Sequence, residues 1–194
     1  MTRVCIVSAS QRANSQSRRI AEVFRDKFLD GQADILDLHE TVLPLFAGPD
    51  SATEAVAQVR EQMAAADAFI FVAPEWHGMA PAALKNLLLW CGAAELAHKP
   101  TLLTAVSASA GGAFVIAELR GSGYKNSRLL WLPEHLILRD VTDLWAGQEG
   151  RRSDEYLEKR ARYAIDMLLT YSQALSGVRE SLLAGLSDFG NGMS

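Results

Sequence analysis

The feature that most constrains the fold is a series of short apolar runs, which begin near residues 4, 33, 68, 101 and 134. Most of these runs are apolar throughout and do not alternate between apolar and polar residues. Continuous apolar strands are typical of a parallel sheet that is covered on both faces. Segments with apolar residues at helical spacing separate most neighbouring runs. This alternation of strand and helix predicts an α/β domain with three layers.

The same patterns give the expected elements. We predict strands over residues 4–8, 33–38, 68–73, 101–106 and 134–138. We predict helices over residues 15–31, 51–66, 81–96, 114–119 and 164–175, and residues 51–54 have the pattern of a capping box. Five strands with crossover helices favour a doubly wound sheet in the order 2-1-3-4-5. Residues 1–176 are expected to form this domain, and residues 177–194 a C-terminal extension with a short helix and a loose tail.

The composition is globular, with 49% hydrophobic and 22% charged residues among 194. The net charge of −4 gives no general electrostatic reason to expect nucleic-acid binding. No apolar run is long enough for a membrane span, and a signal-peptide layout is lacking. The lone cysteines, Cys5 and Cys91, favour a reducing cytoplasm over a disulfide framework, and Cys91 is expected in a helix core. The histidines have no metal-ligand spacing, so no metal site is expected.

Three loops should converge in this topology. The carboxyl ends of strands one, three and four lie side by side in the order 2-1-3-4-5. Residues 8–17, 74–80 and 107–112 leave these ends. The first loop is rich in hydroxyl groups, the second carries Trp76, and the third consists of small residues. Open α/β sheets bind ligands at such a point, so the sequence predicts a ligand site here.

The first loop, residues 8–17, offers hydroxyls, amides and the guanidinium of Arg12 just before a predicted helix. Backbone N–H groups and the helix dipole favour an anion at that position, and an arginine matches a phosphate well. Taken alone, Arg12 fits a surface arginine as well. The loop lacks both the Gly-Lys-Ser/Thr of a Walker loop and the Gly-x-Gly-x-x-Gly of dinucleotide-binding domains. A nucleoside triphosphate site and a Rossmann-type dinucleotide site are therefore not expected.

Two segments resemble one known family, the NADPH-dependent FMN reductases. That family's phosphate loop, Gly-Ser-x-Arg-x-x-Ser, is similar to Ala9-Ser10-Gln11-Arg12-Ala13-Asn14-Ser15. Its segment Pro-Glu-Tyr-Asn-Gly…Pro-x-x-Leu-Lys-Asn resembles residues 74–86, which begin Pro-Glu-Trp-His-Gly and end Leu-Lys-Asn. Trp90, Lys99-Pro100 and Gly111-Gly112 also stand where the family has such residues. The resemblance covers residues 1 to about 175, in order and at matching spacing.

The resemblance implies a flavodoxin-like fold, bound FMN, and transfer of a hydride from NADPH or NADH through FMN to a small-molecule acceptor. The implied acceptors are flavins, quinones, azo compounds or metal oxyanions, reduced in a ping-pong cycle. It implies an FMN phosphate site of Ser10, Arg12, Ser15, Gln16 and Ser17, a ring site of Pro74, Glu75, Trp76, His77 and Gly78, and further ring contacts from Ser107, Ala110 and Gly111. It also implies a homodimer or homotetramer with the flavin at the interface.

Three positions depart from the family pattern. Ala9 replaces a glycine and would restrict the phosphate turn. Trp76 replaces a tyrosine, so an aromatic face is kept and a hydroxyl is lost; it fits either a flavin contact or an interface. His77 replaces an asparagine, and either a proton donor or an ordinary loop residue fits it. A flavin needs no nucleophile from the protein, so no catalytic residue is predicted.

Two other classes of function stay open. One is a flavodoxin-type electron carrier that binds FMN without a substrate site, although such carriers are strongly acidic and a net charge of −4 is mild. The other is a flavin-free binding protein, because one fold hosts many functions.

Overall fold

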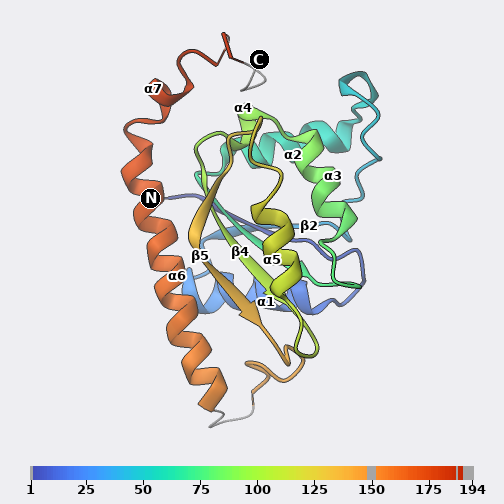
Figure 1. Ribbon diagram of the computed structural model, residues 1–194, viewed down its shortest axis with the longest axis vertical. Coiled ribbons are helices and arrows are strands. Elements are labelled where there is room, and N and C mark those ends of the chain that lie inside the picture. Colours follow the sequence, from blue (N-terminus) through green and yellow to red (C-terminus); the bar gives the residue numbers. More distant parts are fainter. Residues whose placement is uncertain (1, 148–151, 187, 190–194) are drawn as a thin grey trace.

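The structure, a computed structural model, describes residues 2–147, 152–186 and 188–189. Five strands form one sheet in the order β2-β1-β3-β4-β5, and all neighbouring strands are parallel (Figure 1). The strands are β1 (Val4–Ser8), β2 (Ala33–Asp37), β3 (Ala68–Pro74), β4 (Pro100–Val106) and β5 (Leu130–Leu138). The predicted doubly wound, flavodoxin-like fold and its strand order are confirmed.

Helices cover both faces of the sheet (Figure 1). One face carries α1 (Gln16–Val23), which continues into a π-helical turn (Phe24–Phe28), and α6 (Arg152–Ser176). The other face carries α2 (Glu54–Ala65), α3 (Ala82–Trp90), α4 (Ala93–Leu96) and α5 (Ala113–Arg120). A 3-10 turn (Pro49–Ser51) precedes α2, and a short helix, α7 (Arg179–Leu183), follows α6.

The two hydrophobic cores explain why the strands are continuous apolar runs. Val4 and Ile6 of β1 belong to the core under α1 and α6. Cys5 and Val7, the residues next to them, belong to the core under α2, α3 and α5. Successive side chains of a strand point to opposite faces. A strand that is buried on both faces must therefore be apolar at nearly every position.

The fifth strand is longer than predicted, because it begins at Leu130 and not at residue 134. Pro133 lies within it and cannot donate to a ladder hydrogen bond, which hides the first half of the strand in the sequence. The proline is tolerated because β5 is an edge strand and its register against β4 shifts between Thr101 and Leu103.

Several helix boundaries also differ from the prediction. The helix expected over residues 81–96 is interrupted at Gly92, whose backbone N–H donates to Glu95 Oε2 (2.7 Å) at the start of α4. The capping box expected over residues 51–54 is wrong. Ser51 Oγ donates to the carbonyl of Gly48 (2.7 Å) within the 3-10 turn, and α2 starts behind Thr53 without a side-chain cap. The last long helix begins at Arg152, earlier than residue 164.

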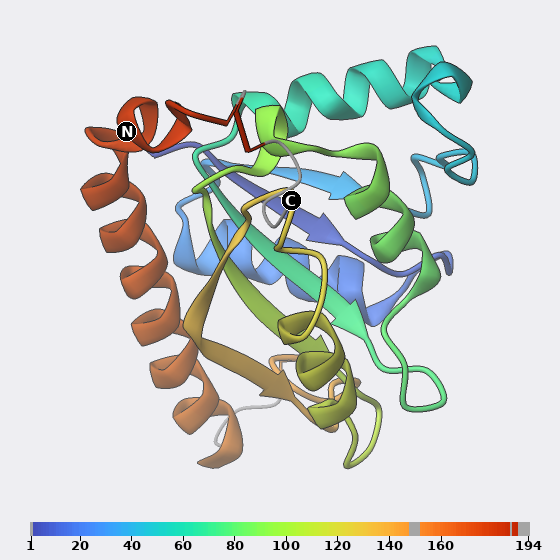
Figure 2. The same ribbon diagram turned by 45° about the horizontal axis from the view of Figure 1, so that its top comes forward.

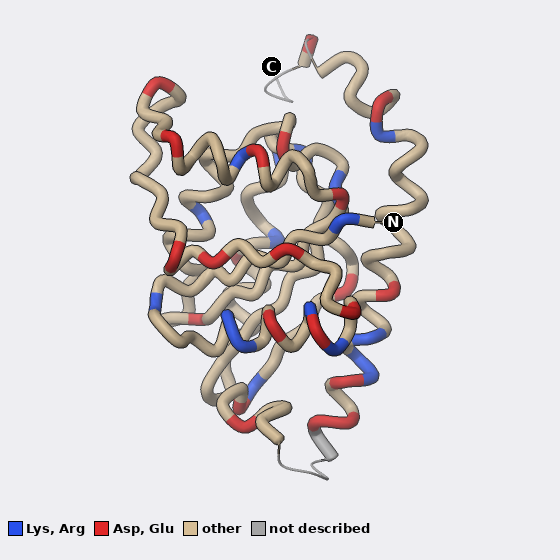
Figure 3. Tube along the Cα trace, turned by 180° about the vertical axis from the view of Figure 1, so that it is seen from behind, with Lys and Arg blue, Asp and Glu red and all other residues tan. Residues whose placement is uncertain are grey.

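All strands run toward one edge of the sheet, where their arrowheads lie together (Figure 2). The loops after β1, β3 and β4 leave from this edge and meet there. On the outer surface, acidic and basic residues are interspersed along α6, as the view from behind shows (Figure 3). Within the described residues, no helix is both long enough and apolar enough to cross a bilayer.

Candidate functional site

A cavity of about 320 Å³ lies at the carboxyl edge of the sheet, where the loops after β1, β3 and β4 meet. This volume is at the lower end of the range found for small-molecule sites. The cavity is lined by Ser10, Arg12, Ala13, Asn14, Ser15, Gln16, Ser17, Pro74, Glu75, Trp76, Val106, Ser107, Ala108 and Val141. The convergence of three loops that the topology predicts is therefore present in the structure.

The structure brings most of the predicted site residues to this cavity. Ser10, Arg12, Ser15, Gln16, Ser17, Pro74, Glu75, Trp76 and Ser107 line it. His77, Gly78, Ala110 and Gly111 lie on the same two loops but not in the lining. Ala13, Asn14, Val106, Ala108 and Val141 line it without having been singled out. Of these, Val141 follows β5, and no motif in the sequence pointed to that segment.

The first loop leads directly into the N-terminus of α1. Ser15 is the N-cap, and its Oγ accepts a hydrogen bond from the backbone N–H of Arg18 (3.1 Å). Ser10 Oγ accepts one from the backbone N–H of Arg12 (3.2 Å). The exposed side chain of Arg12 makes no hydrogen bond or ion pair with the described residues. Its guanidinium is therefore available at the rim of the cavity.

Ser17 indicates which kind of chemical group the first loop can bind. Ser17 is 1% exposed and is one of the residues that line the cavity, yet its Oγ has no hydrogen-bond partner among the described residues. A buried hydroxyl without a partner costs free energy. A ligand oxygen in the cavity would remove that cost, and the adjacent N-terminus of α1 favours an anionic one. These residues fit a phosphate group.

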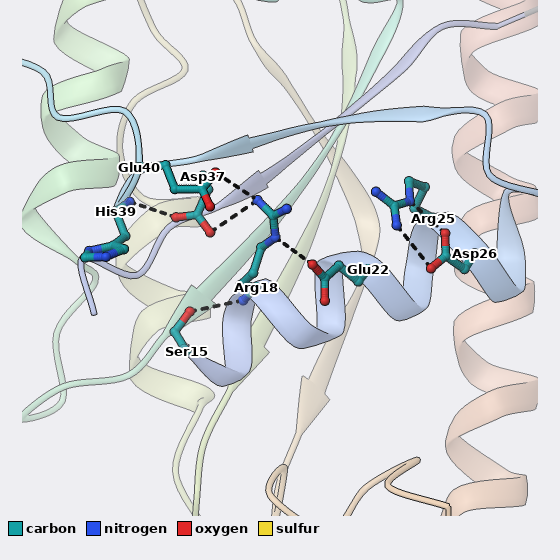
Figure 4. Close-up of polar contacts among 8 residues, drawn as sticks. All are labelled: Ser15, Arg18, Glu22, Arg25, Asp26, Asp37, His39 and Glu40. Atoms are coloured by element: carbon teal, nitrogen blue, oxygen red, sulfur yellow. Dashed lines mark hydrogen bonds and ion pairs between the residues drawn. The ribbon is translucent and has the colours of Figure 1, made fainter. Parts of the chain in front are cut away.

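The first turn of α1 is tied to the end of β2 (Figure 4). Arg18 pairs with Glu22 (2.9 Å) within α1, with Asp37 (3.5 Å) at the end of β2 and with Glu40 (3.4 Å) just beyond it. Asp37 also accepts a hydrogen bond from the backbone N–H of His39 (2.8 Å). These contacts fix the first turn of α1 and, with it, the position of Ser15 and Ser17.

Arg19 ties α1 to the loop that follows β5. Its Nη1 donates to the carbonyl of Leu144 (3.0 Å), and its Nη2 donates to the carbonyl of Val141. Its Nε donates to Gln16 Oε1 (2.7 Å). Burial lowers the pKa of Arg19 from its ordinary value. Arg19 thus links Gln16 and Val141, which line the cavity from different segments.

The second loop is a tight hairpin. Trp76 and Met79 exchange backbone hydrogen bonds of 3.2 and 2.9 Å. His77 and Gly78 at the tip have φ values of +53° and +71°. Positive φ at both central residues is typical of a type I′ turn, which favours glycine at the second position. His77 is exposed at this tip, and its position indicates a role in forming the turn.

The hairpin is anchored to α5 through Glu118. This carboxylate accepts hydrogen bonds from the backbone N–H of Ala80 (2.7 Å) and from Lys85 Nζ (2.6 Å). These two contacts lower the pKa of Glu118 from its ordinary value, and the hydrogen bond from Ala80 has the larger effect. The loop after β3, the start of α3 and the middle of α5 are therefore joined at one side chain.

The third loop needs its glycines. Gly112 has a φ of +107°, and a Cβ there would lie 2.5 Å from Ile137 Cγ2 and 3.3 Å from Ala105 Cβ. Any other residue would be strained and would also clash with β4 and β5. Ser107 Oγ accepts a hydrogen bond from the backbone N–H of Ser109 (3.2 Å), which closes the loop. The small residues are thus explained by close packing against the sheet.

Both thiols lie away from the cavity. Cys91 follows the last residue of α3 and is 3% exposed, which agrees with the expected core position. Burial raises the pKa of Cys5 and of Cys91 to about 12. Neither residue lines the cavity, and the described residues contain no cluster of His, Cys, Asp and Glu that could hold a metal ion.

Comparison with known proteins gives a family match. The model of a family described as NADPH-dependent FMN reductase matches residues 2–141. A curated protein, an NADPH azoreductase from Bacillus sp. (strain OY1-2), is 30% identical over 112 residues, which are 57% of this chain and 61% of the relative. The aligned part thus spans about three-fifths of that relative.

Solved structures share the fold. An oxidoreductase from Corynebacterium diphtheriae superposes with a TM-score of 0.73 at 17% identity, over 90% of this chain and 98% of its own. FerB from Paracoccus denitrificans, a flavoenzyme NAD(P)H:(acceptor) oxidoreductase, has a TM-score of 0.73 at 21% identity, over 90% of this chain and 98% of its own. Identities this low support the fold alone.

Proposed function

The chain belongs to the NADPH-dependent FMN reductase family, and we propose that it passes a hydride from NADPH or NADH through bound FMN to a small-molecule acceptor. The predicted family is therefore confirmed, and the expected enzyme class, an oxidoreductase with FMN and NADPH, is that of the family. The acceptor, the ping-pong order and the residues that hold the flavin belong to this proposal.

The observation that carries the proposal is the buried, unpartnered hydroxyl of Ser17 at the N-terminus of α1. Ser17 lines the cavity together with Ser10, Arg12, Ser15 and Gln16, which supply hydroxyl, amide and guanidinium donors. These are the groups that a phosphate monoester requires. We assign the FMN phosphate to this end of the cavity.

The other end of the cavity would hold the flavin ring. Pro74, Glu75 and Trp76 line it from the loop after β3, and Ser107 lines it from the loop after β4. His77, Gly78, Ala110 and Gly111 lie on the same loops outside the lining, and we assign them to shaping those loops. Trp76 is partly exposed, so its aromatic face is available to a planar ligand.

The mechanism divides between the cofactor and the chain. When bound, FMN would supply the hydride-transfer chemistry. The chain binds and orients: the first loop holds the phosphate, and the hairpin of residues 76–79 and the loop of residues 107–112 limit the space beside the ring. No side chain is assigned as nucleophile, and His77 is not assigned as proton donor, because it is exposed at the hairpin tip.

Steady-state kinetics test the order of the reaction. NADPH oxidation would be followed at several fixed concentrations of a soluble benzoquinone. The proposal predicts parallel double-reciprocal lines, because NADP⁺ leaves before the quinone binds. Lines that intersect would mean that both substrates bind together and would contradict the ping-pong order. The quinone, flavin and azo compounds form one class of planar acceptors, and rates with each would rank them.

We also propose that the chain forms a homodimer, or a homotetramer built from such dimers. Val42, Leu45 and Leu89 are 74%, 82% and 61% exposed. The segment around Phe46 packs on α3: the ring of Phe46 contacts that of Trp90 (4.9 Å between centroids), and its backbone N–H donates to Asn86 (2.9 Å). Val42 and Leu45 line one pocket together with Leu43, and exposed apolar residues that lie together are typical of an interaction site.

A cytoplasmic location is part of the same proposal. Cys5 and Cys91 are both free thiols in the structure. Unpaired, buried cysteines are what a reducing compartment allows.

A further inference from the structure

Helix α5 has no capping residue of its own. Its N-cap is Gly112, which has no side chain, and the structure shows no local side-chain cap. The first backbone N–H groups of a helix have no partner within the helix and need one elsewhere. Most helices meet this need with a serine, threonine, aspartate or asparagine at the N-cap.

A carboxylate from another loop takes this role. Glu75 follows the last residue of β3, and its Oε2 accepts hydrogen bonds from the backbone N–H groups of Gly112 (2.8 Å), Phe114 (3.0 Å) and Val115 (3.3 Å). A negative charge is favoured at this end of a helix by the helix dipole. Glu75 therefore caps α5 across a distance of 37 residues in the sequence.

The third loop is shaped around this carboxylate. A Cβ on Gly111 would lie 2.8 Å from Glu75 Oε1 and 3.0 Å from Ser107 Oγ. Glycine at this position thus leaves room for the Glu75 carboxylate where it caps α5, and a Cβ there would require Glu75 to shift. Both Glu75 and Ser107 line the cavity, so the contact joins two of its walls.

Two carboxylates hold the loop after β3 and α5 together. Glu75 runs from the loop to the start of α5, and Glu118 runs from α5 back to the N–H of Ala80. The hairpin of residues 76–79 lies between these two contacts. The loop and the helix are therefore expected to move as one unit.

We infer that Glu75 is a positioning residue for the flavin site: its side chain caps α5 and so fixes the two cavity walls that the ring would occupy. This inference rests on the proposed FMN site. The family resemblance implies that Glu75 is part of the ring site, and the structure gives its side chain a separate role as the cap of α5. Its charge also lies in the cavity wall, where it opposes the gain of negative charge by a group that is being reduced.

Two substitutions separate the cap from the charge. Glu75→Ala removes the acceptor, and we expect FMN affinity, measured by quenching of flavin fluorescence, to fall about tenfold. Glu75→Gln keeps one acceptor oxygen and removes the charge, so we expect it to restore affinity to within about threefold of the wild type. We also expect the flavin midpoint potential of Glu75→Gln to be more positive than that of the wild type.

Glu95→Ala is the matched control. Glu95 caps the start of α4 through the backbone N–H of Gly92 (2.7 Å) and does not line the cavity. We expect this variant to lose stability while FMN affinity and midpoint potential stay at the wild-type values. Amide hydrogen exchange without FMN should show faster exchange at Gly112, Phe114 and Val115 in Glu75→Ala only.

The outcomes separate this inference from the proposed function. If the wild type binds FMN and Glu75→Ala binds it equally well, the positioning role is wrong while the FMN site stands. If both Glu75 variants keep the wild-type midpoint potential, the influence of the charge is wrong. If the wild type does not bind FMN, the proposed function is wrong. Slow exchange at the start of α5 would then show that Glu75 caps the helix but has no role in flavin binding.

Discussion

Ser8 and Ser17 are alike in chemistry and burial and differ in what they face. Both side chains are at most 1% exposed, and both Oγ atoms lack a partner among the described residues. Only Ser17 lines the cavity. An unsatisfied hydroxyl of a residue that lines a cavity fits a contact with a ligand. An unsatisfied hydroxyl away from the cavity only lowers the stability of the folded protein.

Ser17→Ala is therefore expected to have opposite effects on folding and on binding. The free energy of unfolding without FMN should stay equal or rise slightly, because a buried hydroxyl without a partner is removed. FMN affinity should fall about tenfold, because one hydrogen bond to a charged group is lost. Chemical denaturation and flavin fluorescence titration measure the two effects. Ser8→Ala is the control: its affinity should not change, and an equal loss of affinity in both variants would contradict the phosphate assignment.

The cysteines provide a second prediction for single residues. Burial raises the pKa of Cys5 and of Cys91 to about 12, so neither thiol forms a thiolate near neutral pH. We expect both to react with an aromatic disulfide reagent only at the rate at which the protein unfolds. Labelling of the native protein with increasing amounts of urea, compared with the urea dependence of unfolding, measures this. Rapid labelling of one thiol in the native protein would show that it is accessible.

At this scale, the sequence predicted the site residues that belong to motifs. The phosphate loop and residues 74–76 line the cavity because each directly follows a strand of the predicted sheet. The sequence did not separate His77 and Gly78 from these, because it does not show that residues 76–79 close a hairpin whose two tip residues are not part of the lining. It also missed Val141, whose approach depends on Arg19 reaching the loop after β5.

Between elements, the contacts of Glu118 give a dependence of stability on pH. Its pKa in the folded protein lies below its ordinary value of 4.5, chiefly through the backbone N–H of Ala80 and then through Lys85. The folded state thus binds the proton less readily than the unfolded state. The stabilisation is present above the unfolded pKa and is lost as the pH falls through the folded one.

We expect Glu118→Gln to lower the free energy of unfolding at neutral pH and to become equal to the wild type in acid. Urea unfolding between about pH 7 and pH 3 measures the difference. It should disappear as the carboxylate of Glu118 becomes protonated in both the folded and the unfolded state. Glu61→Gln is the control, because Glu61 is exposed on α2 and makes no hydrogen bond or ion pair with the described residues. A difference for Glu118→Gln that stays constant over this range would rule out the ionic contribution.

The strands were easier to predict than the boundaries of the helices. A strand buried on both faces must be apolar at nearly every position, and the three inner strands β1, β3 and β4 show this in the sequence. The break at Gly92, by contrast, depends on the Glu95 carboxylate turning back to its own helix start. The start of β5 depends on a register shift that accommodates Pro133 at the sheet edge. Tertiary contacts determine these boundaries, so the local sequence carries little signal of them.

For the whole molecule, the exposed apolar residues Val42, Leu45 and Leu89 predict self-association. Leu45→Glu places a charge on a residue that is 82% exposed, so it should not disturb folding, but it should oppose burial of this residue in an interface. We expect sedimentation velocity to show the wild type as a dimer or larger and Leu45→Glu at a lower mass. Leu182→Glu on α7, at a residue that is 43% exposed, is the control and should keep the wild-type mass. A wild type that stays monomeric at all concentrations would contradict the proposed dimer.

The chain as a whole is organised around one edge of its sheet. The first loop offers a phosphate site, and the two loops held together by Glu75 and Glu118 offer walls for a planar ring. The C-terminal division, a domain of residues 1–176 and an extension of residues 177–194, stays a prediction. Within the extension, Arg179, the first residue of α7, contacts Asp67 just before β3, and its Nη2 donates to the carbonyl of Asp67 (3.2 Å).

The most direct test is an absorbance spectrum of the protein after FMN is added and unbound flavin is removed, followed by anaerobic addition of NADPH. The proposed function predicts that the flavin bands are retained and that they bleach on addition of NADPH or NADH. Bands that are retained but do not bleach with either nucleotide would indicate an electron carrier without its own substrate site. If no flavin is retained and NADPH is not oxidised in excess FMN, the chain is not an FMN reductase.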